Sequence, residues 1–161
     1  GLAYLPQEPS VFGRLSVEEN IMAALEQRKD INKTQRKREL ERLIEEFRLN
    51  NLLKTKSIKL SGGERRRVEI ARSLSSNPRF ILLDEPFAGI DPIAVSELKE
   101  ILKKLREMKL GILISDHNVR ETMQICDHVL IMSEGKEIAK GTPSNISTNE
   151  LVKEVYLGQD F

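Results

Sequence analysis

Two short apolar runs, separated by a helical pattern, constrain the fold more than any other feature of the sequence. Residues 80–83 are Phe-Ile-Leu-Leu and lead into Asp84, and residues 111–114 are Gly-Ile-Leu-Ile and lead into Ser115. Continuous runs of this length are typical of strands that are buried on both faces of a parallel sheet. Between them, an Asp-Pro pair followed by apolar residues every three or four positions predicts a capped helix. A strand, a helix and a strand in this order predict a parallel α/β sheet with a right-handed crossover.

Helical signals dominate the N-terminal half. An apolar run over residues 2–5, ended by a proline, predicts the end of a strand, and a loop follows it. Ser16 and Glu19 have the spacing of a capping box, so we expect a helix from Val17 onward.

Two further helices are expected before the first long apolar run. Residues 40–47 carry an amphipathic stripe, and the basic run over residues 33–38 before them predicts a solvated helix face. Ser61 and Glu64 repeat the capping-box spacing. We therefore expect three segments: the end of a core strand and a loop in residues 1–16, an inserted all-helical subdomain in residues 17–77, and the C-terminal part of an α/β core in residues 78–161.

Short elements are expected near the C-terminus. Residues 128–133 and 137–140 flank Gly135, which predicts a hairpin. Asn118, with Glu121 three residues later, and Asn149 are predicted to cap short helices.

Composition excludes several classes of protein. The 26 basic and 25 acidic residues leave a formal charge of +1, too small a net field to steer the whole molecule toward nucleic acid. The single cysteine, Cys126, excludes an intramolecular disulfide framework and a multi-cysteine zinc site. No apolar run approaches the roughly 20 residues that a membrane helix needs. We therefore expect a protein of a reducing, aqueous compartment.

Two adjacent acids follow the first long apolar run. Asp84 and Glu85 are expected at the C-terminal edge of a parallel sheet, where open α/β sheets bind ligands. Neighbouring residues of an extended chain point in different directions, so one acid can serve Mg²⁺ while the other polarises a water as general base. The alternative for an isolated pair is two solvated acids at a strand end.

The predicted helix after Leu60 begins with a serine and two glycines. Ser61, Gly62 and Gly63 would lie at the positive end of the helix dipole, and glycines allow phosphate oxygens to approach backbone N–H groups. Taken alone, such a pattern is more often an ordinary capped helix than an anion site.

Together with the acid-bearing strand, these residues resemble the ABC-type ATPases. Each of five segments, in the family's order, resembles one of its motifs. They are Tyr4–Gln7 (Q-loop), Leu60–Glu64 (signature), Ile81–Glu85 (Walker B), Ala88–Asp91 (D-loop) and Ser115–His117 (switch histidine). The resemblance covers essentially the whole chain, and it implies a P-loop NTPase-like parallel sheet core.

The resemblance implies ATP and Mg²⁺ as ligands and a role for each matching residue. Glu85 would be the general base. Asp84 and Gln7 would complete Mg²⁺ coordination and sense the γ-phosphate. His117 would hydrogen-bond the γ-phosphate and hold the attacking water.

The signature residues imply a second copy of the subunit. Ser61, Gly62, Gly63 and Glu64 would contact a nucleotide bound to the other subunit of a head-to-tail homodimer. Asp91 would couple the two ATP sites.

The sequence departs from the family in one respect. It contains no G-x-x-x-x-G-K-[ST] string, whose backbone and lysine cradle the phosphates, and it lacks the aromatic residue that stacks on adenine. Both belong before the Q-loop strand in this family, so we expect an N-terminally truncated chain with an incomplete core. The polypeptide alone is expected to have no ATPase activity and no strong ATP binding.

Four segments resemble one member of the family in particular, the ATPase of the lipopolysaccharide export (Lpt) system. The four segments are residues 63–72, with their three arginines, 84–92, 115–122 and 155–161. That ATPase works as a homodimer under two membrane subunits, which implies a peripheral place on the cytoplasmic face of the inner membrane. The alternative is the ATPase of branched-chain amino acid uptake, which residues 9–20 resemble.

Transmembrane permease subunits are expected to contact residues 7–15. The alternative is that the apolar side chains there pack internally against the helix that begins at Val17. DNA-repair and chromosome-maintenance ATPases share some of the motifs, but the segment between Gln7 and Ser61 is too short for their coiled coils, so no nucleic-acid partner is expected. The expected docking residues are Pro9, Val11, Phe12 and Leu15, with Arg14 at the rim.

Overall fold

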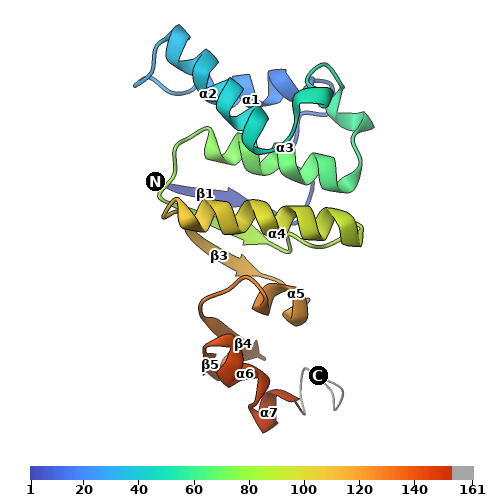
Figure 1. Cartoon of the computed structure of the whole chain (residues 1–161), viewed down its shortest axis with the longest axis vertical. Helices are drawn as coiled ribbons and strands as arrows, with labels where there is room; N and C mark the ends of the chain where they lie inside the picture. Colours follow the sequence, from blue (N-terminus) through green and yellow to red (C-terminus); the bar gives the residue numbers. More distant parts are fainter. Residues whose placement is uncertain (154–161) are drawn as a thin grey trace. The chain divides into compact units, whose positions relative to one another are not determined.

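The computed structural model describes residues 1–153 of the chain (Figure 1). These divide into two compact units, Gly1–Asp116 and the residues from His117 onward. Among residues 1–153, no helix combines the length and the hydropathy that crossing a membrane requires.

A three-stranded parallel sheet is the centre of the first unit. Its strands are β1 (Leu2–Leu5), β2 (Phe80–Asp84) and β3 (Gly111–Ser115), and β2 lies between the other two. The register places Leu5 beside Leu83 and Asp84 beside Ser115, so all three strands end at one edge. Helix α4 (Pro92–Glu107) connects β2 to β3, with Asp91 as its cap. The predicted parallel α/β sheet with a helical crossover is confirmed.

The two faces of this sheet differ. Ala3, Leu5, Ile81 and Leu83 are buried on one face, where the helices pack. On the other face, large apolar side chains are between 53% and 70% exposed: Leu2, Tyr4, Phe80 and Leu113. The expectation that β2 and β3 are buried on both faces is therefore wrong for the structure of this chain, because helices pack on one face of the sheet.

Four elements lie between β1 and α3 along the chain, and of these the helices α1 and α2 lie on the side of α3 away from the sheet (Figure 1). Helix α1 (Val17–Leu25) has the expected capping box, in which Ser16 and Glu19 exchange hydrogen bonds. Helix α2 (Lys33–Glu46) begins earlier than its apolar stripe, because Asn32 caps it, so the basic run forms its first turns. The short 3₁₀ turns η1 (Asn50–Leu52) and η2 (Ser57–Lys59) lead to α3 (Gly62–Leu74).

A buried apolar core joins α1, α2 and α3, and Ile21, Leu43, Phe47 and Ile70 are fully buried in it. Burial of each such side chain contributes about 1.5–3 kcal/mol, which holds the helices together. The segment boundaries expected after residues 16 and 77 stay predictions.

The second unit is built on a hairpin. Strands β4 (Val129–Ser133) and β5 (Lys136–Gly141) are antiparallel, and Gly135 turns the chain with a φ of 74°. The hairpin and the Asn118 and Asn149 caps are confirmed. The unit's helices are α5 (Val119–Met123), α6 (Pro143–Ser147) and α7 (Glu150–Val152), and its core is Ile131, Ala139, Ile146 and Val152. The segment 155–161, one of those used for the Lpt resemblance, lies outside the described residues.

Candidate functional site

Asp84 is the last residue of β2, and each neighbouring strand supplies it with a hydroxyl. Its Oδ1 accepts a hydrogen bond of 2.6 Å from Ser115 Oγ, and its Oδ2 accepts one of 3.2 Å from the Tyr4 hydroxyl. Partial desolvation, the hydrogen bond and the charge of Asp84 raise the pKa of Tyr4. Both hydroxyls stand within the motifs quoted from the sequence, yet neither was predicted to act on the carboxylate.

Glu85 follows in a left-handed backbone conformation, with a φ of 42°. Its N–H donates to the carbonyl of Ser115 at 2.7 Å, which continues the sheet by one bond. A strained conformation of this kind costs about 1–3 kcal/mol and persists only where the surroundings enforce it. A left-handed turn, and not the extended chain that the sequence suggested, therefore joins the two adjacent acids.

The side chain of Gln7 reaches Glu85 from the loop after β1. Gln7 Nε2 donates to Glu85 Oε2 at 2.8 Å. This donation leaves Gln7 Oε1 as an acceptor. Three of the predicted site residues, Gln7, Asp84 and Glu85, therefore meet at one edge of the sheet.

Arg66 lies behind this edge and was not predicted to do so. Arg66 is the second of three consecutive arginines, and it is 6% exposed. Its Nη1 donates to the carbonyl of Pro6, and its Nη2 donates to the carbonyls of Asp84 and Glu85, each at 2.9 Å. Successive helix residues turn by about 100°, so only one arginine of the three faces the sheet.

The sequence held a signal for this burial. Gly63, Arg66 and Ile70 recur at the spacing of one helix face, and all three are buried. Glu69 follows Arg66 by three positions, the spacing of a helical ion pair.

Ser61 caps α3 as predicted. Its Oγ accepts from the N–H of Glu64 at 3.3 Å, and its own N–H donates to Glu64 Oε2 at 2.8 Å. Both side chains border a shallow groove of about 180 Å³ that Asp91 and Arg67 also line. Asp91 caps α4 there, with its Oδ1 accepting from the N–H groups of Ile93 and Ala94.

The two signature glycines have a packing role in the structure. A Cβ on Gly62 would lie 3.0 Å from the carbonyl oxygen of Gly89. A Cβ on Gly63 would lie 2.4 Å from the Cβ of Ala94. Both glycines therefore let the start of α3 approach the segment before and within α4, whatever else they bind.

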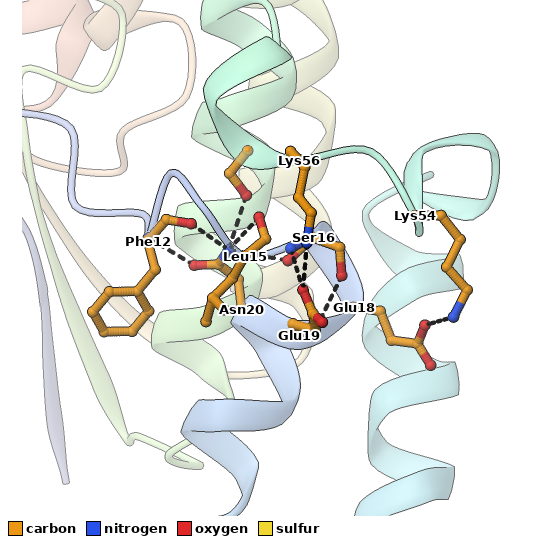
Figure 2. Close-up of polar contacts among 9 residues, drawn as sticks. Phe12, Leu15, Ser16, Glu18, Glu19, Asn20, Lys54 and Lys56 are labelled. Carbon is orange, nitrogen blue, oxygen red and sulfur yellow. Dashed lines mark hydrogen bonds and ion pairs between the residues drawn. The ribbon is translucent and has the colours of Figure 1, made fainter.

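The loop after β1 is held from the side of α1. Asn20 is fully buried, and its Oδ1 accepts from the N–H of Phe12 at 2.9 Å (Figure 2). Its Nδ2 is within 2.9–3.1 Å of the Phe12 and Ser16 carbonyls and of Ser57 Oγ. Figure 2 also shows Lys54 and Lys56 meeting Glu18 and Glu19 at the start of α1.

The ring of Phe12 is 56% exposed, and the Arg72 guanidinium lies 5.1 Å from its centroid. Pro9 and Arg14 are exposed too, while Val11 and Leu15 are half-buried. The ring of Phe12 is therefore not packed in the interior, which was the alternative for this loop.

His117 is the first residue of the second unit. Its carbonyl accepts from the N–H of Val119 at 3.0 Å, at the start of α5. Asp116, the last residue of the first unit, caps the turn after β2 by accepting from the N–H of Phe87 at 3.2 Å. The role of His117 stays a prediction.

The donor set suits Mg²⁺ better than a metal held by protein alone. Within residues 1–153, no group of three or more His, Cys, Asp and Glu side chains could hold a metal ion. Mg²⁺ is usually bound through one or two carboxylates, with water and substrate phosphates as its other ligands. The oriented Asp84 carboxylate and the Gln7 amide oxygen match that requirement.

Comparisons with known proteins agree with the motifs. A family model described as ABC transporter matches residues 1–88, more than half of the chain. The chain belongs to the ABC transporter family. It is 56% identical over its whole length to the lipopolysaccharide export system ATP-binding protein LptB of Haemophilus influenzae, and it covers 67% of that protein. The corresponding protein of Escherichia coli K12 is 55% identical with the same coverage.

Solved ABC transporter structures share the fold. CbiO1 of Clostridium perfringens, part of the transporter complex cbiONQ, superimposes with a TM-score of 0.84 at 26% identity. The match covers 98% of this chain and 64% of that one. The ABC cassette MJ1267 in its ADP conformation gives a TM-score of 0.81 at 26% identity, with 99% and 69% covered. The predicted fold class, an incomplete ABC-type α/β core with helices, is confirmed.

Proposed function

We propose that this chain is part of the ATP-hydrolysing subunit of a lipopolysaccharide exporter. The observation that carries the proposal is identity of 55–56% over the whole chain to proteins named for lipopolysaccharide export. The acid-bearing sheet edge, with Gln7 beside Glu85, supplies the chemistry. Branched-chain amino acid import is the weaker alternative, because the two relatives described above are named for lipopolysaccharide export.

In this proposal Glu85 is the general base. Its carboxylate takes a proton from the attacking water, and the Gln7 N–H bond holds one of its oxygens in place. Asp84 and the free oxygen of the Gln7 amide would hold Mg²⁺, which when bound neutralises charge on the phosphates. The hydroxyls of Ser115 and Tyr4 fix the orientation of the Asp84 carboxylate.

The groove at the start of α3 is the proposed contact with a second copy of the subunit. Ser61, Gly62, Gly63 and Glu64 would face the γ-phosphate of ATP on the partner, where the helix N-terminus favours an anion. Asp91, on the same groove, would link the two sites of a head-to-tail homodimer. His117 would hydrogen-bond the γ-phosphate of its own site.

Two membrane permease subunits are the proposed partners of the loop around Phe12. The exposed ring and the hydrogen bonds between Phe12 and Asn20 support a preformed docking surface. In the proposal this surface meets the permeases on the cytoplasmic face of the inner membrane. Phe12→Ala should then weaken assembly and leave solubility unchanged.

The 161 residues are proposed to be inactive by themselves. They contain no P-loop string, so no backbone nest or lysine of that motif holds the phosphates. Mg²⁺-dependent ATP turnover by a polypeptide of these residues, abolished by Glu85→Gln, would overturn this part.

The test of function uses the full-length protein that contains these residues, reconstituted with the membrane pair of the exporter. We expect ATP-dependent release of lipopolysaccharide from the proteoliposomes, and loss of it with Glu85→Gln. Assembly with an amino-acid permease in place of the export pair would favour the alternative.

A further inference from the structure

A buried ion pair on α3 lies directly behind the acid-bearing edge. We propose that Glu69 is a positioning residue that, through Arg66, keeps the side chains of Gln7 and Glu85 in contact. The proposal rests on the proposed function, because it assigns a role to Glu69 in the same reaction.

Glu69 is only 2% exposed and is held on both oxygens. Its Oε1 accepts from the N–H of Ser10 at 2.8 Å, and its Oε2 accepts from Arg66 Nη1 at 3.2 Å. Burying two charges is costly even when they are paired, and an apolar pair of similar volume is often as stable. The burial of this pair therefore calls for a reason other than stability.

The reach of the Arg66 guanidinium supplies that reason. It donates to the carbonyl of Pro6, the residue before Gln7, and to the carbonyl of Glu85 itself. One rigid guanidinium group thus fixes the backbone beside Gln7 and at Glu85, whose side chains meet at 2.8 Å. Glu69 holds this guanidinium in the single orientation that reaches both backbone segments.

The conformation of Glu85 depends on the same contacts. Its positive φ is strained for a residue with a side chain, so it needs enforcement from the surroundings. Arg66 provides this through the carbonyls of Asp84, Glu85 and Pro86. Without its anchor, the turn can relax and move Glu85 away from Gln7.

Helix α3 also holds the loop that follows Gln7. Glu69 accepts a hydrogen bond from the N–H of Ser10, and Arg72 Nη2 donates to Ser10 Oγ at 2.9 Å. Arg66, Glu69 and Arg72 stand three residues apart on α3, whose first turn carries the signature motif. A displacement of the proposed docking loop, residues 7–15, would therefore be transmitted through Glu69 to the turn at Asp84 and Glu85.

The test compares variants of the full-length protein in complex with its membrane partners. Glu69→Gln keeps the shape and an acceptor for Ser10 but removes the charge that orients Arg66. We expect kcat to fall by about tenfold or more, since a misplacement of ~1 Å can cost ~100-fold, while the KM for ATP changes less than about threefold. Glu100→Gln, which removes an exposed ion pair of the same helical spacing with Lys103, should leave both unchanged.

A double variant separates positioning from stability. Arg66→Met with Glu69→Leu leaves no unpaired buried charge, so we expect it to be more stable than Glu69→Leu alone, although the carbonyls of Pro6, Asp84 and Glu85 lose their donor. We expect kcat to remain about tenfold or more below that of the wild type. Recovery of kcat together with stability would show a merely structural pair and overturn the proposal. A wild-type kcat in Glu69→Gln would overturn it as well.

Amide hydrogen exchange gives a readout that needs no activity. In Glu69→Gln the N–H of Glu85 should exchange faster because its turn can relax, while the N–H of Ser10, which keeps an acceptor, and that of Ala71 on α3 should not. Unchanged exchange at Glu85 would overturn the proposal. A wild-type protein that does not hydrolyse ATP would instead refute the proposed function, and the exchange result would still decide the role of Glu69.

Discussion

Gly63→Ala tests whether the signature glycines are needed for packing. The new Cβ would lie 2.4 Å from the Cβ of Ala94, whereas two carbon atoms prefer about 3.5–4.0 Å, so α3 and α4 must separate by about 1 Å or more. Overpacking of this kind costs about 1–3 kcal/mol, and the higher helix propensity of alanine returns about 1 kcal/mol. The difference between these two effects is about 0–2 kcal/mol. Because the atom that the new Cβ meets is itself a Cβ and cannot rotate away, we expect the upper half of this range, a net loss of about 1–2 kcal/mol in the free energy of unfolding.

The assay is urea unfolding of the full-length protein without nucleotide, so that no phosphate contact contributes. Gly13→Ala is the matched control, because its Cβ would lie 3.6 Å from Ile58, an ordinary contact, and it should change stability by less than about 0.5 kcal/mol. Adding Ala94→Gly to Gly63→Ala removes the clashing atom, and the two changes should couple by about 1 kcal/mol or more. Additive effects, or a Gly63→Ala variant as stable as the wild type, would refute the packing argument.

Three further predictions concern the docking loop and the acid-bearing edge. Asn20→Ala leaves buried groups of Phe12 and Ser57 without their partner. We therefore expect a loss of about 1–3 kcal/mol in the free energy of unfolding and faster hydrogen exchange of the Phe12 amide. A variant of unchanged stability with a protected Phe12 amide would contradict this. Phe12→Ala removes an exposed ring and should change stability by less than about 0.5 kcal/mol while it weakens complex assembly; misfolding would show that the ring belongs to the core. The pKa of Tyr4 is raised in the folded protein, so its phenol should ionise above its ordinary value of 10.0, and stability should fall as the pH rises past the unfolded value. Ultraviolet titration should show Asp84→Asn lowering that pKa, and an unchanged titration would exclude Asp84 as a cause.

Local signals in the sequence predicted the elements well. The capping boxes at Ser16 and Ser61 involve residues three apart, so a linear pattern contains all that determines them. The apolar runs that became β2 and β3 are similarly local, and their parallel order follows from the helix between them. The acids at the sheet edge followed from the same argument.

Features that depend on how elements pack were missed. The burial of Arg66 depends on the rotation of α3 against the sheet, and three adjacent arginines look alike in sequence. The partners of Asp84 come from β1 and β3, far away along the chain. The packing of Gly63 on Ala94 joins two helices, and a phosphate-binding glycine gives the same pattern.

ATP turnover by Glu85→Gln tests the central claim most directly, namely that the acid beside Gln7 is the general base. The full-length protein that contains these residues is assayed for steady-state hydrolysis and for ATP affinity, with Glu100→Gln as control. We predict that Glu85→Gln lowers kcat by about 100-fold or more, the range of general-base catalysis, while ATP still binds. A Glu85→Gln variant that hydrolyses ATP at the wild-type rate would contradict the account.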